Sequence, residues 1–143
     1  SHIEDLGLYR GLSCSSILLK EKQAKGGICV SKKYLVHEVQ RELATLKRIE
    51  QTATILRLAE KRYENLVKAN LKEIEEYAKL VVRTPNDDDS ACFLSKKRDC
   101  ENAALRYQKA LYEVKQKICM NAAIHQLHSR RLSALEKQQR EAV

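Results

Sequence analysis

Five cysteines and two neighbouring histidines are the residues of this chain whose types could do chemistry. The cysteines are Cys14, Cys29, Cys92, Cys100 and Cys119. No two of them have the spacing that zinc sites and redox motifs use. His125 and His128 are three residues apart, so they would share one helix face, but a metal site needs a third and a fourth ligand. We expect reduced thiols, some of them acting as small core residues, and no metal.

Motifs for phosphate binding and for nucleophilic catalysis are missing from the sequence. All four glycines lie within the first 27 residues, so the remainder has no glycine-rich phosphate loop. Neither a nucleophile elbow nor a zinc-protease motif occurs. The run Asp87–Asp89 lacks the alternating spacing and central glycine of a calcium loop. We therefore expect a protein that is not an enzyme, with no catalytic residues, no cofactor and no small-molecule substrate.

Basic residues exceed acidic ones, and some of them are clustered. The chain has 27 Lys and Arg against 19 Asp and Glu, a net charge of +8. One cluster is Lys96, Lys97 and Arg98, and a second is Arg130 and Arg131. These clusters could contact phosphates, anionic lipids or acidic protein segments. A solvated helix surface is the competing interpretation, and no aromatic residue interleaves with them as single-stranded nucleic-acid binding requires.

The placement of turn-forming residues predicts an all-α fold with two very long helices. From residue 28 onward there is no glycine, and Pro85 is the only proline. A sheet or α/β domain needs several turns, which draw on Gly, Pro, Asn and Asp. The segment 84–90, with sequence TPNDDDS, is the one strong turn signal after residue 28. It divides the chain into two segments without internal helix breakers.

Capping residues refine the predicted bounds of these elements. We expect the first long helix at about 31–83, with Ser31 as its N-cap, because a serine hydroxyl accepts from the free amides of the first turn. The second should run over about 91–143 and be capped by Asp89 or Ser90. The organisation is then an N-terminal extension with a short helix, residues 1–30, followed by a helical hairpin, residues 31–143, with its turn at 84–90.

Both long segments repeat apolar residues at alternating intervals of three and four, the spacing of helices that pack along a seam. In the first segment the repeat comprises Leu35, Val39, Glu42, Leu46, Ile49, Ala53, Leu56, Glu60, Tyr63, Val67, Asn70, Ile74, Tyr77 and Val81. In the second it comprises Phe93, Lys97, Cys100, Ala104, Tyr107, Leu111, Val114, Ile118, Asn121, His125, His128, Leu132, Leu135 and Gln139. A short loop makes such helices antiparallel neighbours. The sequence therefore predicts an elongated antiparallel helical hairpin.

The repeat of the second segment becomes polar at Asn121, His125 and His128. Pairing the two segments about the middle of the predicted turn places Asn121 opposite Thr52 and His125 opposite Arg48. A polar layer of Thr52, Asn121 and His125 could set the register, as single buried polar residues do in coiled coils. The alternative is that the hairpin opens to a partner at this layer.

Two helices that pack only on each other leave part of their apolar surface in water. The candidates for that exposed flank are Leu43, Leu58, Leu66, Leu71, Val82, Ile124 and Leu127. Such a flank predicts self-association, as a homodimer that forms a coiled coil or a four-helix bundle, or a groove for another protein.

These features favour a non-catalytic coiled-coil module for protein–protein interaction or dimerisation, in a scaffold, adaptor, cytoskeletal or centrosomal protein. One alternative is a regulator of a small GTPase, an exchange factor or an effector, that acts through a helical face. Another is a basic helical module that binds anionic membrane or nucleic acid. Since no signal peptide is visible, we expect an intracellular protein, cytoplasmic or cytoskeleton-associated, with the nucleus as a further option.

Overall fold

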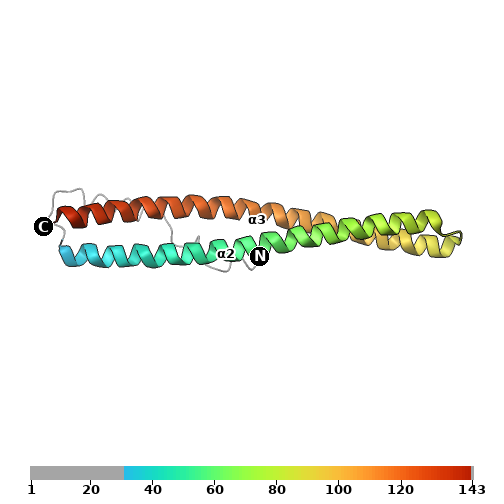
Figure 1. Cartoon of the computed structure of the whole chain (residues 1–143), viewed down its shortest axis with the longest axis horizontal. Helices are drawn as coiled ribbons and strands as arrows, with labels where there is room; N and C mark the ends of the chain where they lie inside the picture. Colours follow the sequence, from blue (N-terminus) through green and yellow to red (C-terminus); the bar gives the residue numbers. More distant parts are fainter. Residues whose placement is uncertain (1–30, 143) are drawn as a thin grey trace. The chain divides into compact units, whose positions relative to one another are not determined.

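Two long α-helices make up nearly all of residues 31–142, which are the residues that the computed structural model describes. Helix α2 spans Lys32–Arg83 and helix α3 spans Asp87–Glu141, and no strand occurs in this part of the chain (Figure 1). The all-α class and the two long helices are therefore confirmed. The short helix expected within residues 1–30 lies outside the described residues.

Helix α2 begins and ends where the sequence predicts. The Ser31 hydroxyl accepts a hydrogen bond from the amide of Tyr34 at 3.1 Å, so Ser31 is the N-cap. At the other end, the amide of Thr84 donates to the Leu80 carbonyl at 3.0 Å, and its hydroxyl donates to the same carbonyl at 2.7 Å. Pro85 then ends the helix, because proline lacks an amide hydrogen and disfavours helical geometry at the preceding residue.

Helix α3 begins at Asp87, four residues before its predicted start. The N-cap is Asn86, whose side-chain oxygen accepts from the amide of Asp88 at 2.9 Å and whose carbonyl accepts from the amide of Ser90 at 2.9 Å. The seven-residue turn with a cap at Asp89 or Ser90 is therefore wrong, and the loop has three residues. Aspartates are turn formers, but three of them in a first turn also favour a helix, because they face the positive end of its dipole.

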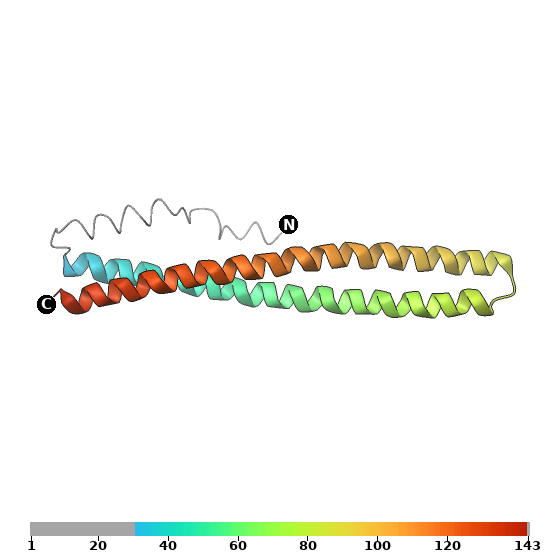
Figure 2. The same ribbon diagram turned by 90° about the horizontal axis from the view of Figure 1, so that it is seen from above.

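The described residues form two compact units, each built from one stretch of α2 and one stretch of α3. The first unit combines residues 31–54 with residues 120–142. The second, which we call the loop unit, comprises residues 55–119. Within each unit the two stretches lie side by side and run in opposite directions (Figures 1 and 2). Each unit is thus an antiparallel helix pair with its own part of the seam.

The predicted seam is confirmed along both helices. All twenty-eight residues of the three-and-four repeat are buried or half-buried. Leu35, Ile49 and Leu56 are the largest fully buried side chains. Burying one such side chain contributes roughly 1.5–3 kcal/mol to the stability of the helix pair.

Aromatic pairs show the register of the loop unit. Tyr63 and Tyr107 have ring centroids 6.2 Å apart, and Tyr77 and Phe93 have centroids 6.3 Å apart. Each pair is equidistant from Pro85 along the chain, which makes Pro85 the loop centre. The predicted centre lay between one and two residues later, because the turn was expected to extend to residue 90.

Candidate interaction site

Four charged or titratable side chains are buried together in the first unit. Glu38 and Glu42 come from α2, and His128 and Arg131 come from α3. The Arg131 guanidinium donates to Glu42 at 2.8 Å and to Glu38 at 3.4 Å. His128 Nδ1 lies 2.7 Å from the other carboxylate oxygen of Glu42. We call these four residues the charged cluster.

The charged cluster specifies how the two helices of the first unit pair. A buried charge costs several kcal/mol unless partners satisfy it, so a slipped register that separated Arg131 from Glu42 would be unfavourable. Arg41 adds a contact from the surface, 3.4 Å from Glu38. His128 Nε2 is buried with no hydrogen-bond partner among residues 31–142. The geometry indicates that these cross-helix contacts fix the pairing of the two helices.

Asn121 adds a polar contact between the two helices of the first unit. Both Asn121, a seam residue, and Thr52, which directly precedes one, are buried. The side-chain amide of Asn121 donates to the backbone carbonyl of Ile49 at 3.2 Å. The hydrogen bond thus crosses from α3 to α2, but its acceptor is one helical turn before Thr52. A seam residue sits among several residues of the facing helix, so simple opposition does not identify its partner.

His125 is half-buried and has a different partner from the expected Arg48. Its Nε2 lies 3.3 Å from the Glu50 carboxylate, and its Nδ1 lies 3.4 Å from the Ser129 hydroxyl. Arg48 is exposed. The pairing with Arg48 is therefore wrong: a carboxylate can accept from an imidazole N–H, whereas a guanidinium has no acceptor.

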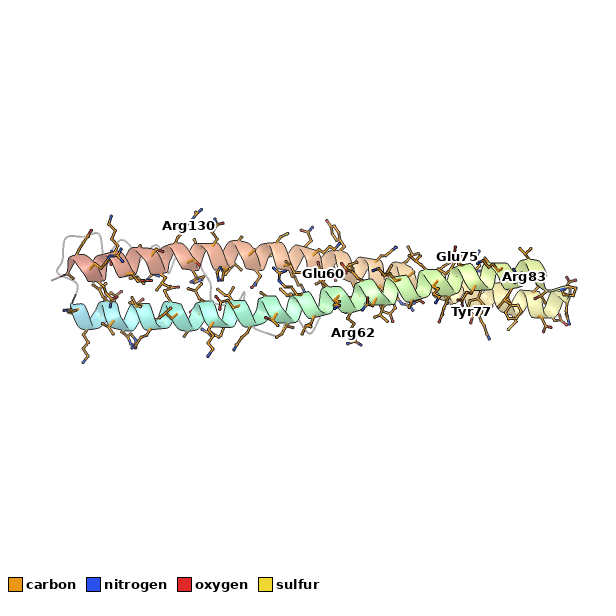
Figure 3. All side chains as sticks on the ribbon, viewed as in Figure 1. Glu60, Arg62, Glu75, Tyr77, Arg83 and Arg130 are labelled. Carbon is orange, nitrogen blue, oxygen red and sulfur yellow. The ribbon has the colours of Figure 1, made fainter. Side chains whose placement is uncertain are left out.

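The two basic clusters do not form continuous positive surfaces. Arg131 is buried in the charged cluster, whereas Arg130 is exposed and points away from α2 (Figure 3). In the other cluster, Lys97 is half-buried and forms an ion pair of 3.3 Å with the Glu101 carboxylate. Its two neighbours in that cluster are exposed. The expectation that Arg131 faces an anionic partner is thus wrong, since its charge is satisfied within the helix pair.

The three cysteines of the described residues are free, and they differ in exposure. Cys92 and Cys119 are exposed, whereas Cys100 is buried in the seam and donates to the Glu73 carboxylate at 3.2 Å. Burial raises the pKa of the Cys100 thiol, and the negative charges of Glu73 and Asp99 raise it further. Cys100 is therefore a protonated core residue rather than a reactive thiol.

The candidates for the exposed flank do not share one surface. In an antiparallel helix pair, residues that directly follow seam positions lie on one side, and residues that directly precede them lie on the other. In the first unit, Leu43 follows a seam residue, whereas Ile124 and Leu127 precede one. In the loop unit, Leu71 follows a seam residue and Leu66 precedes one. Leu58 neither follows nor precedes one directly and points away from the seam; Leu66 and Ile124 are also half-buried.

One side of the loop unit gathers large exposed apolar side chains. They are Leu71, Val82, Leu94, Leu105 and Tyr112. Each directly follows a seam residue, and they come from both helices, so they share a side. We call these five residues the apolar face. Leu71 and Val82 were predicted to be exposed, whereas Leu94, Leu105 and Tyr112 were not, although their position directly after a seam residue is visible in the sequence.

Residues 31–142 contain neither a metal site nor a membrane span. No group of three His, Cys, Asp or Glu side chains there is placed to hold a metal ion. Neither α2 nor α3 contains a stretch that is long and apolar enough to cross a membrane. The charged cluster and the apolar face are thus the two unusual features of the described chain.

Comparisons with known proteins add no relative. The chain matches no protein-family model, and neither the curated proteins nor the solved structures contain a significant match. Function is therefore inferred from the residues and their packing.

Proposed function

We propose that this chain is a non-catalytic helical module whose function is to bind another protein chain through the apolar face. The observation that carries the proposal is the gathering of five large, exposed apolar side chains on one side of the loop unit. Large exposed apolar side chains that gather on one side of a helix pair are typical of a protein interaction site. A scaffold or adaptor needs such a surface and no catalytic group.

The packing inside the loop unit supports this proposal. Its seam is already filled by the ring pairs Tyr63–Tyr107 and Tyr77–Phe93 and by the buried side chains of Ala104 and Val114. The apolar face is therefore not needed to hold the two helices together. Its side chains are available to a partner without opening the seam.

Binding to an anionic membrane or to nucleic acid is less well supported. Such binding depends on clustered cationic side chains that face the solvent. Arg131 is buried against Glu42, and Lys97 is ion-paired within its own helix. The cations that remain exposed in the two clusters are Lys96, Arg98 and Arg130. We therefore rank a protein partner above an anionic surface.

The proposal is tested by immobilising the purified chain and identifying the proteins that it retains from an extract supplemented with a tagged copy of the same chain. We expect the wild-type chain to retain protein, and a Leu105→Lys, Tyr112→Lys variant to lose it. The matched control is Leu58→Lys, which changes an equally exposed leucine that points away from the seam. Failure of the wild-type chain to retain any protein, or retention that the double variant leaves unchanged, would refute the proposed function.

A further inference from the structure

We infer that the partner bound by the apolar face is a second copy of this chain, packed antiparallel about a two-fold axis that passes close to Leu71. This inference rests on the proposed function and names its partner. Homodimers are the commonest protein oligomers, and their two-fold interfaces use the same patch on both subunits. Such a patch must be complementary to itself, and the spacing of the apolar face meets this condition.

The apolar side chains are placed almost symmetrically about the middle of the face. Leu71 lies fourteen residues from the loop centre. Leu94 and Leu105 lie nine and twenty residues from it, at similar distances on either side of Leu71. Val82 and Tyr112 lie three and twenty-seven residues from it, at the two ends. At 1.5 Å per residue, the face is roughly 36 Å long, with Leu71 near its midpoint.

An end-for-end rotation of a second copy therefore brings apolar side chains to matching levels. Leu71 meets the level of its own counterpart, and Leu94 meets the level of Leu105 in the other copy. The contact between Leu94 and Leu105 occurs twice. Val82 reaches the same level as Tyr112 of the other copy, but these two lie on helices that do not face each other directly. The outcome is a four-helix arrangement in which α3 packs against α3 of the other copy.

A parallel second copy would make poorer contacts. In that arrangement α3 faces α2 of the other copy at the same distance from the loop. On the same side of the loop unit, α2 carries Arg57 and Lys61 at the level of Tyr112, and Glu64 and Lys68 at the level of Leu105. The largest apolar side chains would then be buried against charges, which is unfavourable. The antiparallel arrangement avoids this for the three central residues, because Leu71 then faces its own counterpart and Leu94 faces Leu105.

The area of the apolar face fits a dimer interface. Its five side chains are between 46% and 86% exposed, which sums to on the order of 400 Å² if a fully exposed Leu or Val carries roughly 100 Å² and a Tyr roughly 200 Å². That sum lies within the range of the apolar patches found on monomers, about 300–600 Å². A standard interface covers about 800 Å² on each partner, of which the polar rim supplies the remainder.

The charges that surround the face also fit a second copy better than an anionic surface. Within its length, positions on the same side carry Lys68 and Arg98 as well as Glu75 and Glu101. A rim with both signs can pair with an identical rim, whereas a surface that binds phosphates or anionic lipids needs one sign to dominate.

The oligomeric state of the full chain tests the inference. Leu105 and Leu58 are 65% and 64% exposed, so they form a matched pair inside and outside the face. By light scattering after size exclusion, we expect the wild-type chain and Leu58→Lys to have twice the mass of one chain. Leu105→Lys should have the mass of one chain, with an unchanged helical circular dichroism spectrum. A single-chain mass for the wild type, or a dimer that Leu105→Lys leaves intact, would overturn the inference.

A cross-linking experiment tests the position of the axis. In a chain whose five cysteines are replaced by serine or alanine, Leu71→Cys should form a disulfide-linked dimer on mild oxidation, because the axis brings position 71 next to its counterpart. Leu58→Cys should remain uncross-linked. Equal cross-linking at both positions would overturn the arrangement. If the wild-type chain is monomeric but still retains a different protein through Leu105, the second copy is refuted while the proposed function stands.

Discussion

Arg131 is the residue whose removal should affect the first unit most. Its guanidinium holds Glu42 and Glu38 at 2.8 and 3.4 Å in a buried setting. Removing one partner of such an ion pair leaves buried negative charge poorly compensated. We expect Arg131→Ala to lower the free energy of unfolding by about 3–5 kcal/mol, measured by urea denaturation. Arg130→Ala, at an exposed neighbouring position, should change it little, and equal effects would contradict the assignment of the charged cluster.

Cys100 should make stability depend on pH at the alkaline end. Because burial and Glu73 raise its thiol pKa in the folded chain, folding favours the protonated thiol. Its contribution is therefore fully present below the ordinary thiol pKa and is lost as the pH rises through the raised value. We expect the stability difference between wild type and Cys100→Ala to change in that direction, as measured by urea denaturation between neutral pH and pH 10.

Alkylation rates provide the control for this expectation. Cys92 and Cys119 are exposed, so they should react with iodoacetamide at a lower pH than Cys100 does. Mass spectrometry of the alkylated peptides would separate the three thiols. Equal reactivity of Cys100 and Cys92 would show that Cys100 is not buried in solution.

Some residue roles were predictable from the sequence, and the charged cluster was partly within reach. The pairing that placed Asn121 opposite Thr52 also places Arg131 opposite Glu42, which is a complementary charge pair. Arg131 nevertheless resembled a surface residue, because a neighbouring arginine made it part of a basic cluster. The burial of Glu38 depends on its position beside the seam, and residue type alone gives no sign of it.

At the scale of the element, the start of α3 depends on Asn86. Its side chain satisfies one of the amides that a helix leaves free at its N-terminus. We expect Asn86→Ala to lower the free energy of unfolding by about 1 kcal/mol, measured by urea denaturation. Asn102→Ala, at an exposed position inside α3, should leave stability unchanged or slightly raised, because alanine favours the helix interior. A similar loss in both variants would argue against capping by Asn86.

The seam of α3 gives a second test at this scale. Ile118 is half-buried in the repeat, and an aspartate there would place an unpaired charge against apolar side chains. We expect Ile118→Asp, or Leu111→Asp, to lower stability by several kcal/mol, seen as a fall in Tm. Gln116→Asp lies on the exposed side of the same turn and should have little effect. Unchanged melting of the Ile118 variant would mean that the register of α3 is different.

The elements themselves were largely predictable, because long segments without glycine or proline leave few alternatives to helix. The seam followed from the three-and-four spacing of apolar residues, which survives even where polar residues interrupt it. The beginning of α3 was not predictable with the same security, since Asp87–Asp89 suit a turn and a helix N-terminus equally well. That ambiguity also displaced the expected centre of the loop.

At the scale of the whole molecule, the division into two units should appear as separate local stability. Ile49 and Val114 are buried in different units. Hydrogen exchange followed by mass spectrometry should show Ile49→Ala reducing protection mainly in residues 31–54 and 120–142. Val114→Ala should reduce it mainly in residues 55–119. If either variant lowered protection equally throughout the described chain, the two units would unfold as one.

This division was not predictable, because the apolar repeat continues through both units without a break in its spacing. The apolar face, in contrast, was within reach of the sequence, because each of its residues directly follows a predicted seam residue. What the sequence does not give is the exposure of each side chain, which depends on the packing of both helices. Leu71 and Val82 were identified by hydrophobicity alone, which cannot separate them from Leu58.

The three-residue loop also restricts how a chain of this design can change length over evolutionary time. An insertion in α2 alone would displace every cross-helix pairing on one side of the insertion, and an insertion that is not a multiple of seven would turn the seam toward solvent. Tolerated changes should therefore come as matched additions or losses of seven residues, one in each helix at the same distance from the loop. Point substitutions beside the seam face no such restriction, so relatives should vary in surface far more readily than in length.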